Sequence, residues 1–229
     1  MIGEGVAVVI GASGGIGAAL FGALRAGGGY RDVVAFSRVS TPGFDITDEA
    51  SLRDAAASLG PAVPRLVVDA TGFLHDGKQR PEKSWRELDP AQMARAFALN
   101  AIGPALIMKH FLPLLPVERV SIFATLSAKV GSIGDNRLGG WYSYRASKAA
   151  LNQLVHTAAI ELARSRPEAI CVALHPGTVA TPLSAPFAKA GLEVRDADTA
   201  ALELLAVLAR LTPADSGGFF DHKGHALPW

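Results

Sequence analysis

The fold of this chain is decided near its start, by the stretch Val6-Ala7-Val8-Val9-Ile10-Gly11-Ala12-Ser13-Gly14-Gly15-Ile16-Gly17. An uninterrupted apolar run of five residues predicts a short strand that is buried on both faces of a parallel sheet. The glycines that follow permit a tight turn and a close approach of the backbone to a ligand. Apolar residues at four-residue steps from Ile16 onward predict a helix, whose N-terminus suits a pyrophosphate. We therefore predict a nucleotide-binding turn; the alternative is a plain turn of small residues.

The rest of the chain alternates between short apolar runs and longer segments with helical spacing. The apolar runs lie at residues 33–36, 66–70, 120–124 and 169–174, the helical segments at 93–112, 144–163 and 197–209, and a last strand is expected at 217–220. This alternation predicts an α/β fold, a Rossmann-type doubly wound parallel sheet forming a single domain over residues 1–229. Only residues 37–44 separate the second strand from Asp45, which is too short for a crossover helix, so we expect that helix to be missing.

The composition narrows the class of protein. The chain has 229 residues with 49% hydrophobic content, and its 22 basic and 21 acidic residues nearly cancel, which gives no indication of nucleic-acid or anionic-membrane binding. It has no signal-peptide pattern at its start and no apolar run of 18 residues. The single cysteine, Cys171, lies in an apolar run, and the histidines lack the spacing of metal ligands. We expect a soluble cytoplasmic protein with no membrane span and no metal.

A tyrosine and a lysine stand four residues apart in Tyr142-Ser143-Tyr144-Arg145-Ala146-Ser147-Lys148. Residues at this spacing share one face of a helix. A phenol with a pKa near 10 is a poor acid or base at neutral pH, and an ammonium group beside it would lower that pKa. We predict that Tyr144 is an acid/base group supported by Lys148. The alternative is two unrelated surface residues; Tyr142 has no lysine at the matching position.

The Gly-x-x-x-Gly-x-Gly turn and the Tyr-x-x-x-Lys pair together resemble those of the short-chain dehydrogenase/reductase family. Within that family, the segment Ile133-Gly134-Asp135-Asn136-Arg137-Leu138-Gly139-Gly140-Trp141 is similar to the sniffer-like carbonyl reductases and the C-factor cell-signalling proteins. The resemblance implies an NAD(P)-dependent oxidoreductase that acts on a small-molecule carbonyl substrate. It also implies a homodimer or homotetramer assembled through the helices at 93–112 and 144–163.

The resemblance further implies which residues contact the cofactor. They are Gly11, Ser13, Gly15, Ile16, Gly17, Ser37, Arg38, Asp45, Ala70, Gly72, Pro176, Gly177, Val179 and Thr181. NADP(H) is favoured over NAD(H), because Arg38 follows the second strand, no acidic residue lies nearby, and a guanidinium can pair with a 2′-phosphate. The alternative for Arg38 is a solvated charge at a strand end. Asp45 resembles the residue that contacts the adenine amine, and its alternative is an N-cap or turn residue.

Two further catalytic positions follow from the resemblance. Asn100 matches the asparagine that holds a water beside the lysine. The family also has a serine at a strand end, about 13 residues before the tyrosine. The residue two before the pair Val130-Gly131, where that serine is expected, is Ala128, so Ser127 is the first candidate and Ser132, twelve residues before Tyr144, is the second. Asp69-Ala70-Thr71-Gly72 likewise stands where the family has Asn-Asn-Ala-Gly.

The side chains expected to line the substrate cleft are Ile133, Leu138, Trp141, Leu183 and Phe187, and the alternative for each is core packing. Gly139-Gly140 and residues 184–193 are candidate lids. We predict reduction of a small apolar ketone or aldehyde, or oxidation of the alcohol; the alternative is an NADP(H)-binding signalling protein with little turnover.

Overall fold

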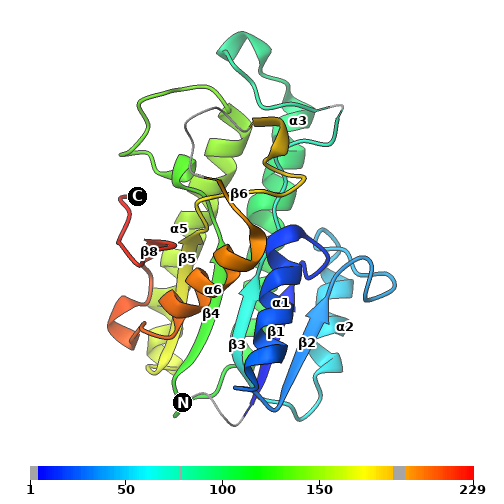
Figure 1. Ribbon diagram of the computed structural model, residues 1–229, viewed down its shortest axis with the longest axis vertical. Coiled ribbons are helices and arrows are strands. Elements are labelled where there is room, and N and C mark those ends of the chain that lie inside the picture. The colour runs from blue at the N-terminus through cyan, green and yellow to red at the C-terminus, as the bar shows by residue number, and fades with distance from the viewer. Residues whose placement is uncertain (1–4, 78, 188–193) are drawn as a thin grey trace.

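The computed structural model describes residues 5–77, 79–187 and 194–229, and these residues are organised around a six-stranded parallel sheet (Figure 1). The strands are β1 (Val6–Ile10), β2 (Asp32–Phe36), β3 (Pro64–Asp69), β4 (Ser121–Leu126), β5 (Ala169–His175) and β8 (Phe219–Asp221). They lie in the order β2-β1-β3-β4-β5-β8, and each neighbouring pair is parallel. β1, β3 and β4 are buried along their whole length, as expected of short apolar strands covered on both faces.

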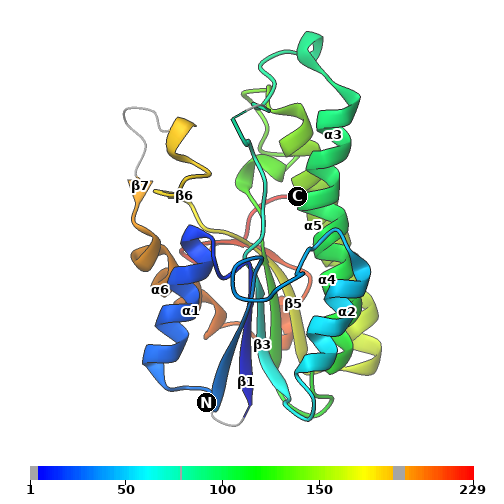
Figure 2. The same cartoon turned by 90° about the vertical axis from the view of Figure 1, so that its right-hand side faces the viewer.

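Helices cover both faces of this sheet (Figure 2). On one face lie α1 (Gly15–Gly27) and α6 (Ala197–Leu208); on the other lie α2 (Glu49–Ser58), α4 (Gly103–Phe111) and α5 (Tyr142–Ser165), with α3 (Pro90–Phe97) continuing beyond α4. Successive side chains of a strand point to opposite faces, so Val8 of β1 enters the core beneath α2, α4 and α5, whereas Val9 enters the core beneath α1 and α6. The predicted doubly wound α/β fold is confirmed.

The short connection after β2 is built from turns alone. Residues 37–48, all of which the structure describes, contain neither a helix nor a strand, and β2 is the edge strand of the sheet. Asp48 then caps α2 by accepting a hydrogen bond from the main-chain N–H of Ala50 at 3.0 Å. The missing crossover helix was therefore predicted correctly.

The helix predicted at 93–112 forms, but it is not uniform. Between α3 and α4 the chain makes a π-helical segment, Ala98–Ile102, with Asn100 at its centre. Pro104 lacks the N–H that a regular helix would use at this point, and π-segments often occur at functional sites. The predicted helical segment is therefore present, with a π-helical segment that the sequence pattern did not indicate.

The same helical run is apolar for a structural reason. Within the described residues, the run Pro90–Leu114 is long and apolar enough to cross a membrane by length and composition alone, a test that core helices also pass. Ile107 and Phe111 are fully buried and belong to the core beneath the sheet. Packing against the sheet therefore accounts for part of its apolar side chains, including these two.

Smaller elements gather beyond the carboxyl ends of the strands, at the upper end of Figure 1. β6 (Thr178–Val179) pairs with β7 (Val194–Arg195), and a short 3-10 helix, Ala185–Phe187, follows β6. In parallel sheets, ligands bind at this carboxyl edge.

Candidate active site

The glycine-rich turn has the shape that a close backbone approach requires. Gly11 adopts φ +83°, and its N–H donates to the Phe36 carbonyl of β2 at 2.8 Å. A Cβ on Gly17 would lie 2.2 Å from the Gly11 carbonyl oxygen, so a side chain cannot fit there without moving the backbone. α1 starts at Gly15 and carries no acidic residue in its first turn, all of which the structure describes. Its exposed N–H groups can thus face an anion.

The glycine turn meets the segment that follows β5. A Cβ on Gly15 would lie 2.7 Å from the Thr181 methyl carbon. Gly177 adopts φ +75° in the turn that leads to this segment, and Val179 is buried in β6. The Thr181 main-chain N–H donates to Ser184 Oγ at 3.2 Å, which orders the first residues after β6. Two groups of predicted cofactor residues, distant in sequence, therefore adjoin.

The residues predicted at the adenosine end lie together after β2. Ser37 is buried, and its Oγ accepts the N–H of Ser40 at 3.0 Å, whereas Arg38 is exposed. Hydrogen bonds from the main chain and side chain of Thr47 lower the pKa of Asp45, and the charge of Arg38 adds to this effect. Asp45 is thus a turn residue here, while Asp48 is the N-cap of α2. The charge of Arg38 is therefore felt at Asp45, at the end of the sheet where β2 finishes.

The segment after β3 contains a buried carboxylate. Asp69 is fully buried and accepts hydrogen bonds from Thr71 Oγ1 at 2.6 Å and from Thr125 Oγ1 of β4 at 2.7 Å. Burial raises the pKa of Asp69, although these hydrogen bonds and the charge of Lys148 oppose the rise. Three donors including the Thr71 N–H replace the water that the carboxylate has lost.

The next residues bring the cofactor and catalytic groups together. The Ala70 N–H donates to the Ile10 carbonyl at 2.8 Å. A Cβ on Gly72 would lie 3.8 Å from Lys148 Nζ and 3.9 Å from Asn100 Oδ1, so these three residues meet at one point. The absence of a side chain at Gly72 keeps the space in front of the lysine open.

Tyr144 and Lys148 lie in the first two turns of α5. Lys148 is buried and its ammonium donates to the Leu126 carbonyl at the end of β4, at 2.8 Å. Tyr144 is half-buried, with the Trp141 ring edge-on at 6.1 Å between ring centroids. A Cβ on Gly131 would lie 2.8 Å from Lys148 Cβ, so the loop after β4 packs directly on this part of α5.

The charges of this pair differ from the expectation. Burial raises the pKa of Tyr144 to about 12, and burial lowers the pKa of Lys148 to about 8 although Asp69 opposes that change. Removal from water disfavours the charged form of each group. The predicted lowering of the tyrosine pKa is not seen in this structure, where burial alone shifts the pKa of Tyr144 and the phenol keeps its proton at neutral pH.

Asn100 is fixed by hydrogen bonds to distant main chain. Its Oδ1 accepts the Phe73 N–H at 2.7 Å, and its Nδ2 donates to the Phe73 carbonyl at 2.8 Å and to Ser147 Oγ at 3.1 Å. The asparagine links the loop after β3 to α5, and it lies beside Lys148 as the resemblance implies.

The two serine candidates occupy different surroundings. Ser127 is buried, and its hydroxyl donates to Asn152 Oδ1 at 2.6 Å, one turn beyond Lys148 on α5. Ser132 accepts the Asp135 N–H at 3.1 Å and donates to the main-chain oxygen of Trp229 at 3.3 Å. Ser127 is thus beside the helix face of Lys148, whereas Ser132 ties its loop to the end of the chain.

Aromatic rings bound the space in front of Tyr144. Trp141 packs edge-on against Phe187 at 5.1 Å, and Phe187 packs edge-on against His75 at 5.3 Å. Nε2 of His75 lies 3.1 Å from the Leu183 carbonyl oxygen, so the loop after β3 contacts the segment after β6. Ile133 and Leu138, also predicted to line the cleft, are 78% and 92% exposed. In the candidate lid, residues 188–193 lie outside the described residues.

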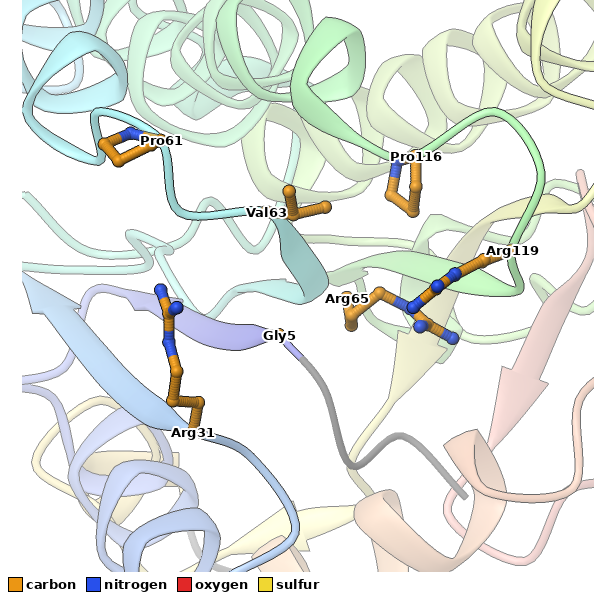
Figure 3. Close-up of a pocket in the computed structure, with 7 residues that line it drawn as sticks. All are labelled: Gly5, Arg31, Pro61, Val63, Arg65, Pro116 and Arg119. Atoms are coloured by element: carbon orange, nitrogen blue, oxygen red, sulfur yellow. The ribbon is translucent and has the colours of Figure 1, made fainter.

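A separate cavity lies at the other end of the strands. Its volume is about 590 Å³, and it is lined by Gly5, Arg31, Pro61, Val63, Arg65, Pro116 and Arg119 (Figure 3). Gly5 and Arg31 directly precede β1 and β2, and Arg65 is the second residue of β3, so the cavity marks the amino edge of the sheet. It is not part of the site around Tyr144.

Sequence reasoning assigned no role to three buried polar residues of this site, Asp69, Glu82 and Asn152. Asp69 had a signal, because it ends an apolar strand at the edge where ligands bind. Glu82 had none, because its partner Ser143 is 61 residues away. In the described part of the chain, three or more His, Cys, Asp or Glu side chains are nowhere grouped so that they could hold a metal ion.

Comparisons with known proteins agree with this geometry. A family model described as Enoyl-(Acyl carrier protein) reductase matches residues 25–214. The C-signal protein of Myxococcus xanthus is 38% identical over 144 residues, which cover 62% of this chain and 82% of that protein. The 1-hydroxy-2-glutathionyl-2-methyl-3-butene dehydrogenase of Rhodococcus sp. (strain AD45) is 30% identical over 204 residues, which cover 86% of this chain and 84% of the dehydrogenase.

A solved structure extends the likeness to the whole chain. The NADPH-bound carbonyl reductase from chicken fatty liver superimposes with a TM-score of 0.85 at 25% identity, over 100% of this chain and 96% of the reductase. Together these matches confirm the resemblance drawn from the sequence motifs.

Proposed function

Because the chain belongs to the short-chain dehydrogenase/reductase family of oxidoreductases, we propose that it reduces a small apolar ketone or aldehyde with NADPH, or oxidises the corresponding alcohol. The observation that carries this proposal is the position of Tyr144 and Lys148 on one face of α5, at the edge of the sheet that also holds the glycine-rich turn. Acid/base chemistry and a phosphate-binding backbone are thus combined in one site.

The glycine turn fits the cofactor by shape. Gly11 and Gly17 leave their backbone groups uncovered, and the N-terminus of α1 provides N–H donors for a pyrophosphate. When bound, the nicotinamide supplies the hydride. Thr181 adjoins the same turn and is placed to contact the cofactor from the side of β6.

Tyr144 acts as the proton donor in the direction of reduction. With a pKa raised to about 12 by burial, its hydroxyl keeps its proton at neutral pH and can donate it to the carbonyl oxygen as the carbon is reduced. The phenolate that remains lies on the helix face of Lys148, whose ammonium stabilises the new negative charge. Asn100, hydrogen-bonded to Phe73 and Ser147, fixes the surroundings of the lysine.

Arg38 supports the preference for NADP(H). It is exposed at the end of β2, and its charge acts on Asp45 across the adenosine end of the site. A guanidinium in this place can form paired hydrogen bonds with a 2′-phosphate, which NAD(H) lacks. The chicken carbonyl reductase, which is similar over the whole chain, has NADPH bound.

A second function from another class is supported by a specific match. The C-signal protein, at 38% identity, shares most of its length with this chain. Ala128 also stands where the family has its serine, which would weaken catalysis but not cofactor binding. An NADP(H)-binding signalling protein with little turnover is therefore the alternative.

Titration of the purified protein with NADPH and NADH, each with and without a panel of aromatic aldehydes and quinones, tests both functions. We expect substrate-dependent oxidation of NADPH, followed at the nicotinamide absorbance. Tyr144→Phe should lower turnover about a thousandfold while NADPH binding persists, since it removes only the transferable proton. Tyr142→Phe, two residues away, is the matched control and should retain activity. Binding without turnover would favour the signalling alternative, and failure to bind either cofactor would refute both.

A further inference from the structure

The catalytic helix α5 begins without a cap of its own. Its N-cap residue, Trp141, adopts the left-handed conformation with φ 54° and gives no side-chain hydrogen bond to the first turn. The first N–H groups of any helix lack partners within the helix and require acceptors from elsewhere. Ser143, in this first turn, is only 3% exposed, so water is not its acceptor.

A glutamate from the loop between β3 and α3 supplies these acceptors. The carboxylate of Glu82 accepts the main-chain N–H of Ser143 at 3.2 Å through Oε2 and the Ser143 hydroxyl through Oε1. The main-chain oxygen of Glu82 accepts the Trp141 N–H at 2.5 Å. Three hydrogen bonds thus join two segments that are 61 residues apart.

The contact is built for a carboxylate. Glu82 is 3% exposed, and an ion removed from water needs full compensation. The positive end of the helix dipole and the charge-assisted bonds to Ser143 provide it. Gly140 leads into this contact with a φ of +65°, a left-handed conformation that favours glycine.

We propose that Glu82 is a positioning residue for Tyr144. It acts through Ser143, the residue directly before the tyrosine, and fixes the first turn of α5 against the loop after β3. The same loop carries His75, which contacts the carbonyl oxygens of Pro182 and Leu183 in the segment after β6. Glu82 therefore sets where the phenol stands relative to the opposite wall of the cleft. This role rests on the proposed reductase function.

The kinetic test compares Glu82→Ala and Glu82→Gln with a matched control, Glu87→Gln. Glu87 lies in the same loop, but its carboxylate accepts the N–H of Lys83 and does not reach α5. We expect Glu82→Ala to lower kcat about thirtyfold, because a small misplacement of a catalytic group is costly, with the Kd for NADPH changed less than about twofold. Glu82→Gln, which keeps an acceptor oxygen, should restore part of kcat. An unchanged kcat in Glu82→Ala, or an equal loss in Glu87→Gln, would overturn the proposal.

Hydrogen exchange tests the same contact without turnover. In Glu82→Ala, the amides of residues 142–146 should exchange about tenfold faster or more, because Ser143 has lost the carboxylate that accepts its N–H and hydroxyl, while residues 150–160 of α5 stay protected. In Glu87→Gln the whole helix should exchange as in the wild type. If the wild type turns over no carbonyl, the reductase function fails, and unchanged exchange at residues 142–146 separately refutes the capping by Glu82.

Discussion

The two halves of the cleft are built from different materials. At the ends of β1 and β2, the site consists mainly of backbone: Gly11, Gly15 and Gly17 offer N–H groups and leave no room for side chains. At the ends of β3 and β4, it consists of buried ionisable and polar side chains. Burial lowers the pKa of Lys148 there and raises the pKa of Asp69. The first half selects by shape and the second by charge, so the two should respond differently to substitution.

The difference follows from what each half must do. A cofactor phosphate needs many donors in a fixed array, which a helix N-terminus provides at no cost in desolvated charge. A proton transfer needs groups whose protonation state can change, and burial is what moves the pKa values of Tyr144 and Lys148 in opposite directions. The catalytic half therefore bears an electrostatic cost that the cofactor half avoids.

Lys148→Met tests the catalytic half most strongly. It keeps the volume of the side chain and removes the ammonium, so kcat/KM should fall about a hundredfold to a thousandfold. The buried charge also costs stability, and a lysine pKa held at about 8 instead of 10.5 corresponds to roughly 3 kcal/mol, part of which the variant should regain. Steady-state kinetics and denaturant unfolding measure the two effects. Lys129→Met, at an exposed lysine paired with Asp135, is the control and should change neither by much.

The stability difference between the wild type and Lys148→Met should also depend on pH, in a direction that the Lys148 pKa fixes. Because the folded pKa of Lys148 is about 8 and the unfolded one is 10.5, the unfolded chain binds more protons between these values. The unfolding free energy of the wild type should therefore rise relative to Lys148→Met as the pH increases from 8 toward 10, while activity falls as the ammonium loses its proton. If the difference in unfolding free energy between the two proteins stays constant over this pH range, Lys148 does not titrate there as a buried group.

Gly17→Ala tests the backbone half. The new Cβ would lie 2.2 Å from the Gly11 carbonyl oxygen, so the turn must move and NADPH affinity should fall by about 2 kcal/mol, or roughly thirtyfold. Calorimetric titration of NADPH measures this, and kcat at saturating cofactor should change far less. Gly22→Ala is the control in the same helix, where nothing lies within 4 Å of the added atom; it should leave binding intact and raise stability by about 0.5–1 kcal/mol. Equal effects of the two substitutions would disprove selection by shape.

The same division explains what the sequence could predict. Strands and the glycine turn are local patterns, and β1, β5 and α5 appear within a few residues of their expected bounds. Local patterns cannot show contacts between distant segments. Asn100, at the centre of the π-segment, is hydrogen-bonded to Phe73, 27 residues away, and the first turn of α5 is hydrogen-bonded to Glu82, 61 residues away.

The pKa shifts of the buried groups could not be predicted from the sequence either. The proximity of Tyr144 and Lys148 was predicted, but the direction of the tyrosine pKa was not, because it depends on how deeply the surrounding loops bury the phenol. Asp69 was seen only as a departure from the Asn-Asn-Ala-Gly pattern, and its hydrogen bonds to Thr71 and Thr125 need the neighbouring strand in place.

Arg38→Ala tests whether a charged side chain adds to cofactor binding in the half of the site that is otherwise built from backbone. Loss of a charge-assisted pair with the 2′-phosphate should weaken NADPH binding by about 1.5 kcal/mol, roughly tenfold, and leave NADH binding unchanged. Fluorescence titration with both cofactors measures the ratio. Arg53→Ala, at an exposed arginine paired with Asp54 on α2, is the control and should alter neither affinity. An equal loss for NADPH and NADH would show that Arg38 does not read the phosphate.

Ser127→Ala and Ser132→Ala are expected to have the smallest effects and to sharpen the boundary of the catalytic half. Ser127 donates to Asn152 on α5 at 2.6 Å, so its hydroxyl stands beside the helix face of Lys148, whereas Ser132 holds the main chain of Trp229. We expect Ser127→Ala to lower kcat about fivefold, the size of one hydrogen bond, and Ser132→Ala to lower it less than about twofold. The Ser127 hydroxyl must leave Asn152 to reach a carbonyl, so Asn152→Ala should raise the Ser127 contribution rather than abolish it. If Ser132→Ala lowers kcat more than Ser127→Ala does, the catalytic half extends to the loop after β4. Ser132, released from Trp229, would then fill the role of the family serine that Ala128 replaces in this chain.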